Sequence, residues 1–277
     1  MNNSTVNFTT SAASTNSTTQ FIVAQQIMEI CMHITSFLIG LPTHCYVIWL
    51  IVTGTGNGLA SEFFNLNYSL SETGNCLNNL FVVLTFWVSG LITLKEFMTG
   101  LTITGRPLFQ CLMCVERYMA VVHPVTFLKY KPLRYRVICC AVAWIIILGI
   151  CLVCMLVKPS NTMFYPWFFF IQFLLFFSVQ LFCLVAVLGA LKQSGPGERK
   201  KEENHMKRRA FYLILITTVS MVITYVPLCL TGLYSIVSEL FIQAVWLFSV
   251  MCYILAGFVQ PVLYLHRIGK LSCTCSS

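Results

Sequence analysis

The chain has 277 residues, of which 57% are hydrophobic and only 9% are charged, and its formal net charge is +8. A soluble domain carries about 25% charged residues, so a chain of this length and composition cannot cover its surface with polar groups. Its mean hydropathy of +0.80 therefore places it in lipid. No alternation of apolar and polar residues between turns is present, so a membrane barrel is not expected.

Seven mostly apolar runs are long enough for helices that cross a bilayer, which need about 20 residues each. They cover about residues 23–53, 63–88, 91–122, 135–157, 164–191, 209–235 and 240–265. The expected fold class is thus an all-α membrane protein, a seven-transmembrane helix bundle. Polar residues interrupt the second and third runs, so we expect these two to face protein rather than lipid. The predicted units are a tail at 1–22, the membrane domain at 23–266 and a short tail at 267–277.

The N-terminal tail is uncharged over residues 1–20 and rich in Ser, Thr and Asn. Asn-X-Ser/Thr sequons begin at Asn2, Asn3, Asn7 and Asn16. We expect a disordered, extracellular, glycosylated segment, although such sequons also arise by chance in this composition. The tail has neither a basic start nor a short apolar core, so the first span is expected to act as the insertion signal.

Lys and Arg residues predict the orientation of the bundle. Of the 17 in the chain, five lie at 116–136, seven at 192–209 and two beyond residue 266. Cytoplasmic loops carry such an excess, so we expect the N-terminus outside and the C-terminus in the cytoplasm. The basic run at 199–209 could equally be only this topology signal and a contact with anionic lipid.

The third span ends in Glu116-Arg117-Tyr118, followed by His123-Pro124. Arg117 is always charged and cannot rest in lipid, and the adjacent Glu116 could pair with it in one state and release it in another. The alternative is a charged helix end that only marks the membrane boundary.

Proline lies inside both of the last two spans, at Pro227 and Pro261. Proline removes a backbone hydrogen bond and kinks a helix, so a small change at the outer end can become a larger displacement at the inner end. Proline is also common in membrane helices that have no such role. Tyr264 is expected to complete the inner surface.

Most of the 14 cysteines lie inside spans and are expected to be buried packing thiols. Cys273 and Cys275 follow the last span directly and are candidate palmitoylation sites. No Cys/His spacing typical of a metal site is present, and neither a metal nor a cofactor is expected.

Several of these residues resemble motifs of the rhodopsin-like (class A) G-protein-coupled receptors, over about residues 25–270. In chain order the matching motifs are Asn67-Tyr-Ser-Leu-Ser-Glu72, Trp87-Val-Ser-Gly90, Glu116-Arg117-Tyr118, Trp144, Tyr225-Val-Pro227 and Gln260-Pro-Val-Leu-Tyr264. Gly40-Leu-Pro-Thr-His-Cys-Tyr-Val47 is closest to the purinergic, protease-activated and lipid receptor branch. The resemblance implies that a freed Arg117 contacts a heterotrimeric G protein. It also implies a switch formed by Glu116, Tyr118, Tyr225, Pro227, Pro261 and Tyr264.

Arg106 departs from the family, which usually has a small polar residue there. It lies eleven residues before Arg117, on the same helical face and about 16 Å deeper. An isolated arginine at that depth costs about 3 to 17 kcal/mol, so it needs a partner. The matched position of Glu72 points at this part of the third helix. We therefore predict a Glu72–Arg106 ion pair that fills the place where many relatives bind sodium.

Other departures affect the switch and the outer end. His44 and Gln260 replace asparagine, and Tyr225 replaces tryptophan. The outer disulfide is expected to be absent, because Ile92 and Leu94 occupy the two possible cysteine positions and the loop at 158–165 has no cysteine. These changes put the efficiency of signalling in doubt.

The expected ligand is extracellular and unidentified. The chain has no Asp, which amine receptors need, and Cys229 and Gly232 stand where nucleotide receptors place basic residues, so an amine is not expected and a nucleotide is unsupported. Aromatic residues crowd the outer ends of the fifth and seventh spans and form either an interfacial belt or an apolar pocket for a lipid. They are Phe164, Tyr165, Trp167, Phe168, Phe169, Phe170 and Trp246.

Three functional classes remain open. The first is a receptor that activates a G protein. The second is a receptor-like protein with weak or no coupling, acting as a decoy or scaffold. The third is a transporter or channel, which the lack of repeats and of a charged path disfavours. Membrane lipid is a further expected partner, nucleic acid is not, and no constellation of an enzyme is present.

Overall fold

The structure, a computed structural model, describes residues 9–54, 62–130, 133–157, 164–192, 198–238 and 243–269. Regular structure in these ranges is helical throughout, without a strand. The expected all-α class is therefore confirmed.

The long helices follow the predicted spans. They are α1 (Thr9–Val52), α2 (Phe63–Leu84), α3 (Ile92–Val122), α5 (Leu133–Val157), α6 (Phe164–Lys192), α7 (Glu198–Ser238), α8 (Gln243–Gly257) and α9 (Val259–Arg267). A single turn, η1 (Ser89–Leu91), precedes α3, and the short α4 (Pro124–Tyr130) follows it.

Helix boundaries differ from the apolar runs at three places. The helix α1 already begins at Thr9, so the expectation of disorder is wrong for residues 9–22. The helix α7 begins at Glu198 rather than at about 209, because Glu, Lys and Arg are good helix formers outside the membrane. The predicted seventh span is divided at Phe258, since Pro261 has no N–H to donate to the carbonyl four residues earlier.

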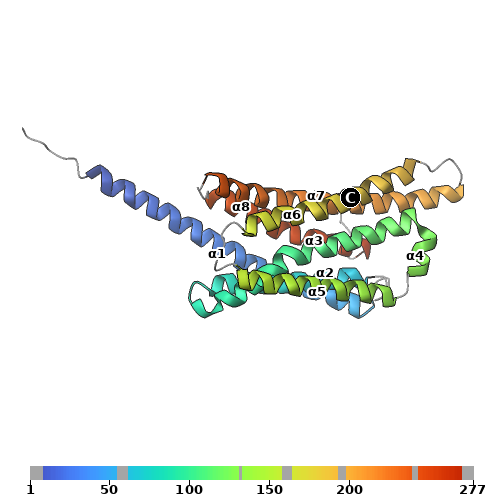
Figure 1. Cartoon of the computed structure of the whole chain (residues 1–277), viewed down its shortest axis with the longest axis horizontal. Coiled ribbons are helices and arrows are strands. Elements are labelled where there is room, and N and C mark those ends of the chain that lie inside the picture. Colours follow the sequence, from blue (N-terminus) through green and yellow to red (C-terminus); the bar gives the residue numbers. More distant parts are fainter. Residues whose placement is uncertain are drawn as a thin grey trace, which may run out of the picture.

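The helix α3 runs through the middle of the bundle. It contacts α2, α5, α6 and α7, and Figure 1 shows it between a layer of α2 and α5 and a layer of α6, α7 and α8. The N-terminal part of α1 projects away from the other helices (Figure 1). A residue on α3 can therefore reach most of the bundle.

Five described segments are long and apolar enough to cross a membrane: Val23–Val52, Leu133–Val157, Trp167–Lys192, Lys207–Tyr234 and Ala244–Arg267. The helices α2 and α3 are more polar, but their polar side chains are buried, among them Glu72, Asn75, Arg106 and Gln110. The two helices therefore turn their polar faces into the bundle, as their interrupted sequences predict.

Candidate functional site

Arg106 of α3 and Glu72 of α2 meet in the interior of the bundle. The distances from Nε to Oε1 and from Nη2 to Oε2 are both 2.7 Å. Each side chain is only 3% exposed. Two parallel hydrogen bonds match the fork of the guanidinium to the two carboxylate oxygens, which makes this contact specific for arginine. The structure thus brings together the two residues that the sequence pairs.

The helix α8 supplies further contacts to Arg106. Nη1 donates to the carbonyl oxygen of Tyr253 at 2.5 Å, and the guanidinium carbon lies 3.9 Å from the centroid of the Tyr253 ring. The Tyr253 hydroxyl donates to the carbonyl oxygen of Thr102 at 2.9 Å and accepts from Asn75 Nδ2 at 2.7 Å. A buried charge is tolerated only when hydrogen bonds surround it. Here those hydrogen bonds come from three helices, so the network fixes α2, α3 and α8 to one another.

Two further residues of this network, Tyr253 and Asn75, are missing from the site that the sequence predicts. Nothing in the sequence pattern marks Tyr253 as a partner of Arg106, because this contact depends on how α8 packs against α3. Asn75 does carry a signal, since it lies three residues after Glu72 on the same helical face. His44, which replaces an asparagine of the family, is 2% exposed and lines a small cavity beside the ion pair.

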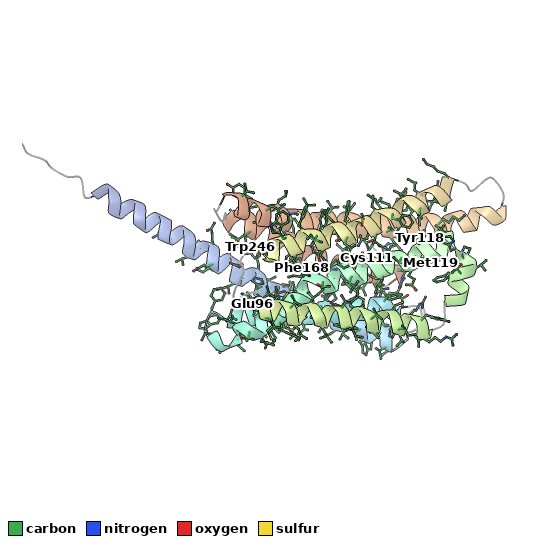
Figure 2. All side chains as sticks on the ribbon, viewed as in Figure 1. Glu96, Cys111, Tyr118, Met119, Phe168 and Trp246 are labelled. Carbon is green, nitrogen blue, oxygen red and sulfur yellow. The ribbon has the colours of Figure 1, made fainter. Side chains whose placement is uncertain are left out.

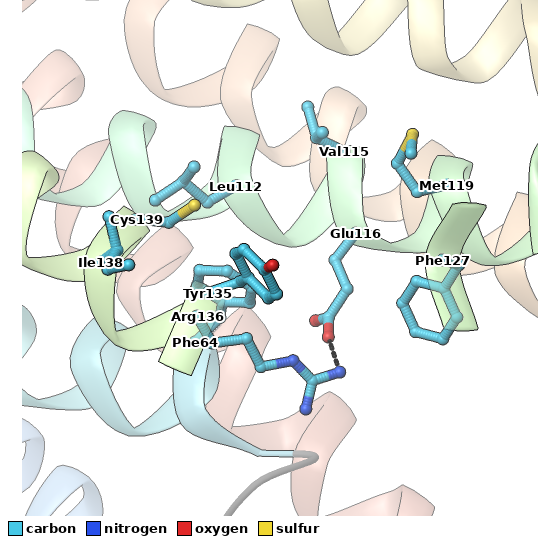
Figure 3. Close-up of a pocket in the computed structure, with 10 residues that line it drawn as sticks. All are labelled: Phe64, Leu112, Val115, Glu116, Met119, Phe127, Tyr135, Arg136, Ile138 and Cys139. Carbon is cyan, nitrogen blue, oxygen red and sulfur yellow. Dashed lines mark ion pairs between the residues drawn. The ribbon is translucent and has the colours of Figure 1, made fainter. Parts of the chain in front are cut away.

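At the C-terminal end of α3, which we call the inner end after its predicted orientation, Glu116 pairs with Arg136 of a neighbouring helix. Its carboxylate contacts Arg136 in the first turn of α5, as Figure 3 shows. In this structure Glu116 therefore holds Arg136, and its alternate pairing with and release of Arg117 stays a prediction. Adjacent residues on a helix do not face each other, whereas Arg136 reaches Glu116 from the neighbouring helix.

The Glu116–Arg136 pair borders a pocket of 340 Å³ between α3, α4 and α5. The lining residues shown in Figure 3 are otherwise mostly apolar. They include Phe64, Leu112, Val115, Met119, Phe127 and Ile138. Arg136 is 9% exposed and Glu116 is 20% exposed, so the pair is only partly screened by solvent.

Arg117 lines a second, smaller cavity together with Gln260 and Tyr264 of α9. Its Nη1 has no hydrogen-bond partner among the described residues. The structure therefore brings Arg117 and Tyr264 to one place, and Pro261 lies between Gln260 and Tyr264 on α9.

The remaining predicted switch residues lie elsewhere. The Tyr118 hydroxyl is 3.0 Å from His123 Nε2, and its ring packs on Phe182 of α6. Tyr225 is 2% exposed and its ring stacks on Phe173 with centroids 6.2 Å apart. Pro227 lies within α7, which continues through it as one helix.

The opposite end of the bundle holds a cavity of about 250 Å³. Figure 2 shows Glu96 and Trp246 at this end and Tyr118 and Met119 at the other. Polar lining residues include Glu29, His33, Asn78 and Lys95, and the apolar ones include Phe169, Leu228 and Val250. The aromatic group from the sequence is divided: Phe169 and Trp246 line this cavity, whereas Trp167 is 50% exposed. The side chains of Phe164 and Tyr165 are outside the described part.

All cysteines within the described ranges are free thiols, so no disulfide joins these helices. Cys31, Cys45 and Cys139 are exposed, which corrects the expectation of buried packing thiols for these three. The described residues also include no group of His, Cys, Asp and Glu that could hold a metal ion. Asn2, Asn3, Asn7, Cys273 and Cys275 lie outside the described residues, and the side chain of Asn16 on α1 does as well.

Comparison with known proteins gives a match to the model of the 7 transmembrane receptor (rhodopsin family) over residues 42–264. The chain is 27% identical to the C-C chemokine receptor type 8 of Homo sapiens over 72% of this chain and 62% of that protein. It is 21% identical to the uracil nucleotide/cysteinyl leukotriene receptor of Rattus norvegicus over 73% of this chain and 65% of that one. It is also 25% identical to a somatostatin-like receptor of Takifugu rubripes, over 47% of this chain and 48% of that one. The chain thus spans less than two thirds of the length of these relatives.

Proposed function

Because the chain belongs to the rhodopsin family of seven-transmembrane receptors, multi-pass proteins of the plasma membrane, we propose that it is a G-protein-coupled receptor. It would convert the binding of an extracellular ligand into activation of a cytoplasmic heterotrimeric G protein. The observation that carries the proposal is the convergence of Arg117, Gln260 and Tyr264 at one end of α3. The family motifs of two helices meet there.

The proposed signal passes along α3, which links the two ends of the bundle. At its first turns α3 lines the cavity that would take the ligand, through Lys95 and Thr99. Further along, Arg106 ties it to α2 and α8. A ligand that shifts α8 would act on this network, and the division at Phe258 would let α9 move separately from α8. Movement of α9 would then uncover Arg117.

Arg117→Ala tests the proposal directly. In cells, G-protein activation by the wild-type chain is expected to exceed background, and the variant is expected to lose it at equal surface expression. Arg134→Ala is the control, because Arg134 is also an arginine near this end but its side chain lies over the Tyr135 ring rather than in the Arg117 cavity. Equal signals from wild type and Arg117→Ala would contradict the proposal.

A receptor-like protein with weak or no coupling is the second candidate. Three observations favour it: Tyr225 replaces a tryptophan, Gln260 replaces an asparagine, and no disulfide secures the described helices. The absence of G-protein activation for any ligand panel, from a chain that reaches the cell surface, would favour this candidate.

We propose a small ligand with one polar part and one apolar part. Polar and apolar side chains both line the 250 Å³ cavity. Lys95 and His33 are its basic lining residues, which is too few for the chain of phosphates of a nucleoside triphosphate. The names of the relatives give chemokine, nucleotide and leukotriene ligands for those proteins only.

A further inference from the structure

Positive charge exceeds negative charge where α2, α3, α5 and α9 meet at the inner end. Two ion pairs form there, Glu116 with Arg136 and Glu62 with Arg267. Arg117 lies beside these two pairs. Among the described residues it has no carboxylate within ion-pair distance, since both nearby glutamates are already paired.

The cavity beside Arg117 is lined by unused hydrogen-bond donors. Arg117 Nη1, Gln260 Nε2, the Tyr264 hydroxyl and Arg267 Nε are all buried and have no hydrogen-bond partner within the described helices. Gln260 and Tyr264 are each only 4% exposed. A buried donor without a hydrogen bond is unfavourable, so four of them around one cavity call for an occupant.

The chemistry of the lining favours an acceptor with negative charge. Guanidinium and amide nitrogens can only donate, and the tyrosine hydroxyl can donate as well. A halide accepts from several donors at once and has no proton to place, whereas a water molecule would also have to donate its two protons to the amide or tyrosine oxygens of the lining. The other lining residues are Asn65, Leu213 and Leu263, and Asn65 Nδ2 already donates to Glu62 at 2.6 Å. The free volume of about 10 Å³ admits one small occupant and no organic ligand.

We propose that this cavity is a binding site for a small inorganic monoanion such as chloride. The ion neutralises Arg117 and connects α3 to α9, with α2 and α7 completing the wall. It therefore stabilises the closed arrangement of the inner end. A further consequence, that chloride lowers basal signalling, rests on the proposed function.

The test uses the full chain in lipid nanodiscs, unfolded by heat in sodium chloride, sodium bromide or sodium gluconate at equal pH and ionic strength. Chloride and bromide are single atoms, whereas gluconate is far too large for the cavity. We expect the Tm to be about 2–4 °C higher in either halide, the shift that corresponds to roughly 1 kcal/mol in a protein of this size. An equal Tm in all three salts would mean that the cavity holds water only, and would overturn the proposal.

Variants at Gln260 separate this site from a general salt effect. Gln260→Glu places a carboxylate in the cavity, so the Tm in gluconate should rise and the halide shift should vanish. Gln260→Leu removes a donor and should also abolish the shift. The matched control is Gln180→Leu, a fully buried glutamine of α6 outside this cavity, which should keep the shift. A halide shift that persists in Gln260→Leu would overturn the proposal. Loss of G-protein coupling leaves these measurements unaffected.

Discussion

At the scale of single residues, Gly257 lies where the α8 backbone passes close to the Glu72–Arg106 pair. A Cβ atom at this position would lie 2.9 Å from Arg106 Nη2 and 3.3 Å from Glu72 Oε2. The missing side chain therefore lets the α8 backbone come near enough for the Tyr253 carbonyl oxygen to accept from Arg106. The buried ion pair depends on a small residue that carries no charge.

Gly257→Ala is expected to destabilise the protein by about 1–3 kcal/mol, because the added methyl group displaces a buried guanidinium. Thermal unfolding in nanodiscs measures the effect as a lower Tm. The control is Gly189→Ala on α6, where nothing lies within 4 Å of the added Cβ. Alanine favours a helix over glycine by up to about 1 kcal/mol, so the control should be neutral or more stable. Equal losses in both variants would contradict the role given to Gly257.

The sequence predicts some of these contacts and not others, for a physical reason. Arg106 and Glu72 can be paired in advance, because a charge in lipid requires an opposite charge and few are present. Gly257 and Tyr253 are ordinary residues of an apolar helix, and only the packing of α8 gives them a role. The sequence assigns Arg136 only to the basic residues that predict the orientation of the bundle. Its contact with Glu116 cannot be predicted in this way, because the two residues lie on different helices.

At the scale of elements, α3 is fixed at two heights. Near its middle, Arg106 holds it to α2 and α8, and near its inner end Glu116 holds it to α5. The second contact is weaker, since Glu116 is 20% exposed and a partly exposed ion pair contributes roughly 0.2–1 kcal/mol. The inner end of α3 is therefore the part that is easier to displace.

Breaking the second contact should favour the signalling state. For Glu116→Gln and for Arg136→Gln, we expect basal G-protein activation to rise about threefold, which corresponds to roughly 0.7 kcal/mol. The double variant should rise no further than either single one, because both changes remove the same contact. Additive effects in a cellular activation assay would show that the two residues act separately.

The seventh span illustrates what a hydropathy pattern predicts for an element. Its length follows from the apolar run at 240–265, but its division into α8 and α9 follows from Pro261. Proline does not divide every helix of this protein, because α7 continues through Pro227 as one helix. The early start of α1 at Thr9 likewise has no signal in hydropathy, since residues 9–20 are polar.

At the scale of the whole molecule, charged side chains lie at two levels of the bundle, and the balance of positive and negative charge differs between these levels. The middle level is neutral, because Arg106 and Glu72 compensate each other in a place that the guanidinium fills. The level around Arg117, in the part of the chain that the structure describes, has two Glu–Arg pairs and, in Arg117, an arginine outside these pairs. Cations and anions should therefore affect the protein differently.

We propose that sodium has no specific effect on the receptor, because Arg106 already supplies the positive charge that Glu72 needs. The Tm in sodium chloride and in potassium chloride should agree at equal ionic strength. Arg106→Leu leaves Glu72 buried and unpaired, which should cost about 3–5 kcal/mol. In that variant sodium, but not potassium, should restore part of the lost stability. A sodium-specific rise in the Tm of the wild-type chain would contradict the proposal.

The Glu72–Arg106 pair also limits how this sequence can change over generations. Losing either partner alone leaves an unpaired buried charge, so a single substitution at either position is costly. A change at one position is tolerated more easily when a compensating change accompanies it. A relative that keeps the arginine should therefore also keep the glutamate, together with the glycine at 257 that makes room for the pair.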